Sequence, residues 1–174
     1  MNIFGEDNEN TIIKIGQYED GVILKTDWIN FSNFKLIGEY KGLLEGVIEV
    51  RKNHITVSDC NIVSGDVGVT IDGEYWYTGD YFNSNCTVSN CTFRDLLVGV
   101  FLLESHHCLV ENCTFYDDVG GAIYILHLGG RHVKRYNHII NCKILGAEVG
   151  VCTKCASCNY ISNCEIYGSS KSFA

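Results

Sequence analysis

The stretch Cys108–Phe115, which reads CLVENCTF, decides the fold because close copies of it recur along the chain. In each copy the third, sixth and eighth positions are apolar, and the fifth is Asn or Asp. The six copies are Ile29–Leu36, Ile55–Ile62, Cys86–Phe93, Cys108–Phe115, Asn137–Ile144 and Asn159–Ile166. Such a repeat predicts stacked rungs, each supplying the same short strands to one continuous core.

The fifth position predicts a turn inside every copy. Apolar and polar residues alternate around it, which indicates strands, while the step from the third to the sixth position requires a turn between them. The residues at this position are Asn33, Asp59, Asn90, Asn112, Asn141 and Asn163. Asn tolerates left-handed backbone angles and bonds to neighbouring backbone groups, so the stacked copies are expected to form a ladder.

A second strand of each rung is expected to begin with glycine, at Gly21, Gly46, Gly68, Gly99, Gly120 and Gly150. The distance between successive copies of the octet varies, which indicates that loops are inserted at the turns. The sequence therefore predicts an all-β fold, a right-handed parallel β-helix solenoid of about six to seven rungs, with residues 1–174 as a single domain. A leucine-rich repeat would require a leucine-dominated consensus, which this chain lacks.

Composition excludes several classes of partner. The net charge is −8 and no strong basic cluster offsets it, which argues against a nucleic-acid partner. The apolar runs are too short for a membrane span, and no charged-then-apolar leader precedes Gly5, so we expect no export signal in this chain.

The Asn column, the glycine-led strands and the opening Ile3–Ile13 resemble the repeats of NosD-like proteins, within the pectin-lyase-like superfold. The resemblance covers nearly the whole chain. It implies a parallel β-helix, a carbohydrate ligand and an extracellular or cell-surface location. The superfold hosts lyases, hydrolases, esterases, epimerases and binding domains, so the resemblance leaves open whether the chain is an enzyme. It also implies that the chain is part of a longer solenoid or lacks its caps.

Most of the ten cysteines are expected to be core residues. Cys60, Cys91, Cys113, Cys142 and Cys164 share the sixth column, where small side chains stack well. Cys86 and Cys108 share another column. Cys152, Cys155 and Cys158 have the spacing of an iron–sulfur run without its fourth ligand, so a metal site or a labile disulfide is the alternative to turn and core cysteines.

Two corner insertions, Asp72–Tyr81 and His127–Tyr136, are the best binding candidates, because long loops on a rigid scaffold often bind ligands. An aromatic wall in the first would face basic residues of the second across the short rung between them, which suits a polysaccharide or oligosaccharide. The candidate ligand-binding residues are Glu74, Tyr75, Trp76, Tyr77, Glu104, His106, His107, His127, Arg131 and His132. The alternative is that the aromatic residues cover the sheet and the charges are solvated.

A carboxylate series, Asp66, Asp118 and Glu148, precedes the strand glycines and could hold calcium, as in the calcium-dependent lyases of the superfold. Turn residues bonded to local amides are the alternative. No catalytic residue can be assigned. The predicted function is a carbohydrate-binding or polysaccharide-modifying domain; the alternative is a non-catalytic structural solenoid that assembles end to end into homo-oligomers.

Overall fold

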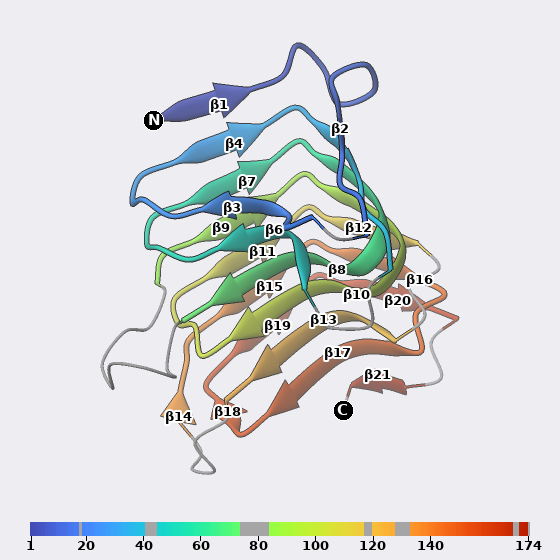
Figure 1. Ribbon diagram of the computed structural model, residues 1–174. Coiled ribbons are helices and arrows are strands. Elements are labelled where there is room, and N and C mark those ends of the chain that lie inside the picture. The colour runs from blue at the N-terminus through green and yellow to red at the C-terminus, as the bar shows by residue number, and fades with distance from the viewer. Residues whose placement is uncertain are drawn as a thin grey trace.

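The computed structural model describes residues 1–17, 19–40, 45–73, 84–116, 120–127, 133–168 and 171–173. The described residues form parallel strands stacked as a solenoid, and they contain no helix (Figure 1). The predicted all-β parallel β-helix is therefore confirmed. No helix that could cross a membrane occurs in the described part of the chain.

Three strand faces surround the core. The first face consists of β1 (Asn2–Phe4), β4 (Asn30–Ser32), β7 (Thr56–Ser58), β9 (Thr87–Ser89), β11 (Leu109–Glu111), β15 (His138–Ile140) and β19 (Tyr160–Ser162). The second consists of β2 (Ile12–Lys14), β5 (Lys35–Ile37), the first half of β8 (Asn61–Asp72), the first half of β10 (Thr92–Leu103), β12 (Thr114–Tyr116), β16 (Lys143–Leu145) and β20 (Glu165–Tyr167).

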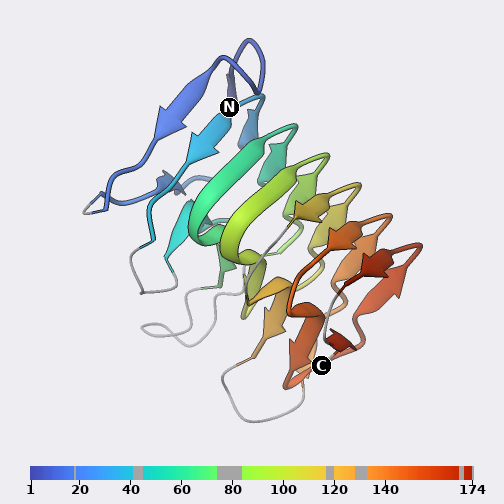
Figure 2. The ribbon, with the colours of Figure 1, turned by 90° about the vertical axis from the view of Figure 1, so that its right-hand side faces the viewer.

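The third face consists of β3 (Val22–Leu24), β6 (Gly46–Val50), the second halves of β8 and β10, β13 (Gly121–Leu126), β17 (Val149–Lys154) and β21 (Lys171–Phe173). A separate pair is formed by β14 (Val133–Lys134) and β18 (Ala156–Ser157). Because β8 and β10 curve from the second face onto the third, these two faces form one sheet (Figures 1 and 2). Positive φ values at Ser64, Gly65 and Asp95 mark the bends.

The core is a set of apolar columns, one from each face. Residues in register on the first face include Val57, Val88, Val110 and Ile139, all fully buried. On the second face the column contains Leu36, Ile62, Phe93, Phe115 and Ile144. The rings of Phe93 and Phe115 stack with their centroids 4.7 Å apart. Repeated burial of the same position explains why the octet pattern predicts the fold.

The Asn corner forms as predicted between the first and second faces. All six residues of the fifth column have φ values between 52° and 63°. Backbone bonds run from rung to rung there: the amide of Asp59 donates to the carbonyl of Ser89 over 3.1 Å, and that of Asn112 donates to Ile140 over 3.1 Å. A side-chain bond also runs along the stack, from Asn90 Nδ2 to Asp59 Oδ1 over 3.3 Å.

The predicted cysteine column is also confirmed. Cys60, Cys91, Cys113 and Cys142 are buried at successive rungs, Cys164 is partly exposed, and all ten cysteines are free thiols. Each thiol of the column donates to a carbonyl two residues earlier, as Cys91 Sγ does to Ser89 over 3.2 Å. Burial and hydrogen bonding to Cys142 raise the pKa of the Cys113 thiol.

The alignment of the strand glycines is correct for four positions and wrong for two. Strand pairing puts Gly68, Gly99 and Gly150 in one column with Ala122, because Val69, Val100, Ile123 and Val151 are in register. It likewise puts Gly21 and Val47 in this column. Gly46 therefore lies one residue before the column and Gly120 two residues before it.

Candidate functional site

A polar cleft of about 490 Å³ lies on the outer side of the second face. Strand pairing arranges its side chains in two columns. Lys35, Asn61 and Thr92 follow one another in the first column, and Val63, Arg94 and Tyr116 do so in the second. We call this the polar cleft; its lining residues are Glu9, Lys35, Asn61, Val63, Thr92, Arg94 and Tyr116.

The side chains of the first column are fixed by a chain of hydrogen bonds. Thr92 Oγ1 donates to Asn61 Oδ1 over 3.1 Å, and Asn61 Nδ2 donates to Glu9 Oε1 over 3.3 Å. The ammonium group of Lys35 lies 3.6 Å from the other oxygen of Glu9. Glu9 comes from the loop between β1 and β2, so four successive rungs contribute to one network.

The second column carries a cation and an aromatic ring. The guanidinium of Arg94 lies over the ring of Tyr116, with 4.9 Å between Cζ and the ring centroid. A cation–π contact of this type holds the planar guanidinium in place while its edge remains able to donate hydrogen bonds. Arg94 is exposed and Tyr116 is half-buried. The cleft thus offers two cations, hydrogen-bonding groups and an aromatic surface.

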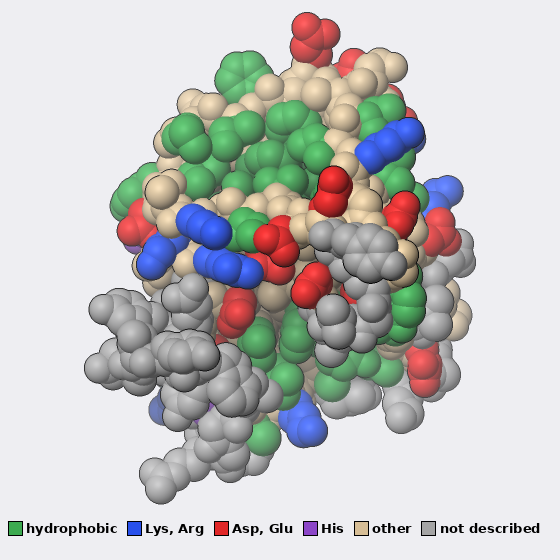
Figure 3. All heavy atoms as spheres, in the orientation of Figure 1, with side chains coloured by type: hydrophobic (Ala, Val, Ile, Leu, Met, Phe, Trp, Pro, Cys, Tyr) green, Lys and Arg blue, Asp and Glu red, His purple; other side chains and the backbone are tan. Residues whose placement is uncertain are grey.

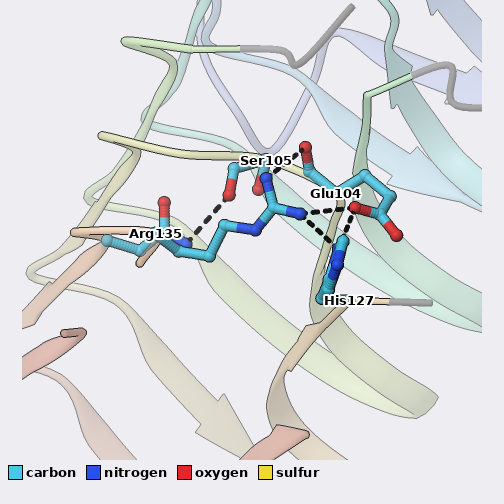
Figure 4. Close-up of polar contacts among 5 residues, drawn as sticks. Glu104, Ser105, His127 and Arg135 are labelled. Atoms are coloured by element: carbon cyan, nitrogen blue, oxygen red, sulfur yellow. Dashed lines mark hydrogen bonds and ion pairs between the residues drawn. The ribbon is translucent and has the colours of Figure 1, made fainter. Parts of the chain in front are cut away.

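A buried ionic cluster lies at the corner where β10 ends (Figure 4). Glu104 and Arg135 are each 1% exposed and His127 is 6% exposed. Arg135 Nη2 lies 2.5 Å from Glu104 Oε2, and His127 Nδ1 contacts both of these groups. Because a guanidinium can only donate and a carboxylate oxygen accepts, Arg135 Nη2 donates to Glu104 Oε2, and His127 Nδ1 lies against both groups.

The charges in this cluster largely balance. Burial lowers the pKa of Arg135, and the neighbouring carboxylate of Glu104 offsets part of that effect. A second buried polar group lies nearby: Asn137 is fully buried, its Oδ1 accepts the amide of Cys108 over 3.0 Å, and its Nδ2 donates to Ser105 O over 3.3 Å. These bonds fix the corner below the surface.

An apolar groove of about 660 Å³ crosses the outer side of the third face. Figure 3 shows hydrophobic side chains over the part of this face formed by β10, β13 and β17. We call this the apolar groove; its lining residues are Leu97, Val98, Phe101, Gly120, Tyr124, Ile125, Leu126, His127, Cys152, Lys154 and Cys155.

The family of this solenoid is shown by comparison with known proteins. A family model described as a right-handed β-helix region matches residues 81–173, which is more than half of the 174-residue chain. The chain belongs to this right-handed β-helix family. No curated protein and no solved structure matches it. The NosD-like subtype stays a prediction.

The predicted corner of this right-handed β-helix comes together only in part. Glu74, Tyr75, Trp76, Tyr77, Arg131 and His132 lie outside the described residues. The flanking residues Asp72 and Leu126 are both in register with Leu103, so the two insertions begin at the same corner, two rungs apart, as predicted.

Between the insertions, the four residues after Leu103 divide into a buried pair and a surface pair. Glu104 and Ser105 are buried, whereas His106 is half-buried and His107 is exposed. The ring of His107 stacks on Tyr136 with 5.4 Å between centroids. Burial lowers the pKa of His106, and His107 and Arg135 lower it further. Among the predicted ligand-binding residues that the structure describes, Glu104 contacts His127 in the interior, and His127 also lines the apolar groove.

The predicted metal sites are not assembled by the described residues. No group of three His, Cys, Asp or Glu side chains in the described ranges could hold a metal ion, and this includes Cys152, Cys155 and Cys158. In the proposed calcium series, Asp66 is buried and Glu148 is exposed, while Asp118 is not among the described residues. Strand register places Leu97 and Gly120 between Asp66 and Glu148, so two rungs without a carboxylate separate these two members of the series.

Sequence reasoning missed the polar cleft and Arg135. A signal for the cleft was present, because the seventh position of the octet is polar in every copy: Lys35, Asn61, Thr92, Thr114, Lys143 and Glu165. The column two residues further on changes from Val63 to Arg94 and Tyr116. For Arg135 there was no such signal, because it follows an insertion whose length hides its position in the rung.

Proposed function

We propose that this right-handed β-helix binds a carbohydrate chain in the polar cleft. The observation that carries the proposal is the preformed network of Glu9, Lys35, Asn61 and Thr92 beside the Arg94–Tyr116 pair. Sugar hydroxyls donate and accept hydrogen bonds, and a sugar binds weakly where the site cannot replace the hydrogen bonds that its hydroxyls made to water. The polar groups in the two columns of the cleft can replace these bonds.

The spacing of the columns suits a polymer of repeating units. Neighbouring parallel strands lie about 4.8 Å apart, so equivalent side chains recur at that interval along the solenoid. This interval is close to the length of one pyranose unit, and a sugar chain lying along the axis would meet one rung per unit. The ring of Tyr116 holds the guanidinium of Arg94 in place, so that Arg94 can donate hydrogen bonds to a sugar.

The charge of the cleft favours an acidic sugar. Lys35 and Arg94 line it with one carboxylate, Glu9, although the whole chain has a net charge of −8. An arginine side chain can bind a uronate carboxylate through two parallel hydrogen bonds. Glycoside hydrolysis generally requires a pair of carboxylates, and the described lining contains one, which Lys35 already pairs. Binding is therefore the activity proposed, at an extracellular or cell-surface location.

The test compares an acidic sugar chain with its neutral counterpart. Affinity for an oligouronate and for the same oligomer with reduced carboxyl groups is measured by calorimetry. Arg94→Ala should weaken binding of the oligouronate about tenfold or more, because a charge-assisted bond is lost, and should affect the neutral oligomer less. Arg51→Ala is the matched control, since Arg51 pairs with Glu49 beside the third face.

Unchanged oligouronate binding in both Arg94→Ala and Lys35→Ala would exclude the polar cleft as the site. If Trp76→Ala abolishes binding while Arg94→Ala does not, the sugar binds at the first insertion instead. End-to-end assembly, the alternative function from the sequence, stays a prediction that light scattering at high protein concentration tests.

A further inference from the structure

We infer that the apolar groove is a second binding site, and that it takes a long acyl chain with an anionic head group. The groove lies on the third face, beyond the bend at Asp95, whereas the polar cleft lies before that bend on the second face. The two sites share β10 and have opposite chemistry. This inference is independent of the carbohydrate proposal.

The outward columns of the third face change character as they cross the groove. Thr70 of β8 is in register with Phe101, Tyr124 and Cys152 of the next three strands. In the adjacent outward column, Asp72 is followed by Leu103 and Leu126, and then by Lys154. The apolar stretch therefore begins at β10 and is bordered by polar residues on β8. From Leu97 to Leu103 it extends about 20 Å along the strand.

The groove has a shaped floor. The rings of Phe101 and Tyr124 meet edge to face with 6.5 Å between centroids and an angle of 88° between planes. A Cβ atom at Gly121 would lie 2.2 Å from the Tyr124 ring, so that ring lies back along the strand over glycine. Gly121 thus allows the ring to lie along the face, which gives the groove an aromatic floor.

The charged groups along the groove give it a direction. Lys154 stands at the end of β17, and no described residue forms an ion pair with its ammonium group. Glu148 directly precedes β17, at the opposite end of this strand; burial raises the pKa of Tyr124, and the nearby Cys152 and Glu148 add to that rise. An anionic head group is therefore attracted towards Lys154 and repelled from the Glu148 end.

These features select among possible ligands. The described lining supplies few hydrogen-bonding side chains, so a sugar would leave many of its hydroxyls unpaired, at a cost in affinity. An acyl chain makes no such demand and gains affinity with each methylene it buries. The volume of about 660 Å³ lies within the range of small-molecule pockets, which are mostly apolar with a few placed polar groups. The cation at one end supplies that polar group.

The test uses a fluorescent polyunsaturated fatty acid below its micellar concentration, displaced by a saturated C16 fatty acid or by the C16 alcohol. We expect one site per chain. Lys154→Gln should weaken binding of the acid about three- to tenfold and leave binding of the alcohol unchanged. Phe101→Ser should weaken both ligands. Lys143→Gln, a half-exposed lysine on the second face, is the matched control and should change neither.

Three results would overturn the inference: no saturable binding of the fatty acid by the wild-type protein, an equal loss for acid and alcohol in Lys154→Gln, or binding unaffected by Phe101→Ser. Circular dichroism of each variant confirms that it is folded. Light scattering of the ligand-free protein tests whether a second copy of the chain covers the groove instead. If the wild type is a dimer and Phe101→Glu dissociates it, the groove is an interface between copies and the inference is wrong. Because the readout contains no sugar, failure here leaves the polar cleft untouched.

Discussion

Replacing Arg135 by methionine should remove about 3–5 kcal/mol from the free energy of unfolding. Both partners are 1% exposed, and Arg135 Nη2 lies 2.5 Å from Glu104 Oε2. The guanidinium also donates to the carbonyl oxygen of Glu104 over 3.5 Å. Methionine fills a similar volume but leaves the carboxylate of Glu104 buried without a countercharge. The cost of that unpaired charge sets the expected loss of stability.

A double variant separates the cost of an uncompensated charge from the value of the pair. Arg135→Met combined with Glu104→Leu removes both charges and keeps the space filled. We expect it to be more stable than Arg135→Met alone. It should fall short of the wild type by about 1 kcal/mol, because His127 stays buried and loses both of its polar partners. A domain of this size is typically stable by about 5–15 kcal/mol, so the single change alone threatens folding.

The assay is urea unfolding at pH 7 followed by far-ultraviolet circular dichroism, with the free energy taken from the linear dependence on urea. Lys134→Met is the matched control, because Lys134 precedes Arg135 and is exposed; it should change stability by less than about 0.5 kcal/mol. A loss of less than about 1 kcal/mol in Arg135→Met, close to the effect of a surface substitution, would refute the reasoning. So would a double variant whose loss of stability equals the sum of the losses in Arg135→Met and Glu104→Leu, because additive losses would mean that the two side chains do not interact.

Three further predictions concern the repeat. Asn112→Ala should cost about 1–2 kcal/mol because φ is 52° there, and Asn112→Gly should recover most of that loss; equal losses would show that backbone conformation is not the cause. A thiol reagent at pH 8 should modify the native protein only at Cys152, Cys155, Cys158 and Cys164, and the remaining cysteines only after unfolding. Since burial raises the pKa of Cys113, its contribution to stability is present below the unfolded thiol pKa and is lost as pH rises above it, from about pH 8.5. Stability measured at pH 7 and pH 9.5 in the wild type and Cys113→Val checks this: a slope unchanged by the substitution would contradict it.

The octet predicted the fold because every rung uses it in the same way. Its third and eighth positions face inward on two different faces, and its fifth position turns the chain between them with a left-handed residue. These requirements are local and steric, so each copy of the octet shows them in its own sequence. Stacking then repeats the environment from rung to rung, which makes the columns visible without any knowledge of the long-range contacts.

The strand glycines were a weaker guide than the octet, because a glycine can be required either by its place in the repeat or by the close approach of a neighbouring strand. A Cβ atom at Gly120 would lie 2.5 Å from the carbonyl oxygen of Leu97, and one at Gly46 would lie 2.9 Å from Thr70 Oγ1. Close approach of neighbouring strands therefore requires these two glycines, which lie outside the column of Gly21, Gly68, Gly99 and Gly150. The backbone register, with Ala122 and Val47 at the equivalent positions, follows from pairing that the composition of one strand does not specify.

Both proposed sites lie where an outward column departs from its neighbours. In one column Ile37 and Val63 give way to Arg94 and Tyr116, and the polar cleft opens there. In another, Thr70 gives way to Phe101 and Tyr124, and the apolar groove begins. Inward positions cannot change in this way, because each must fill the same space in the core. In a parallel β-helix, then, the inward columns hold the fold constant, and a change of chemistry along an outward column at about 4.8 Å per rung is the feature to search for when a binding site is sought.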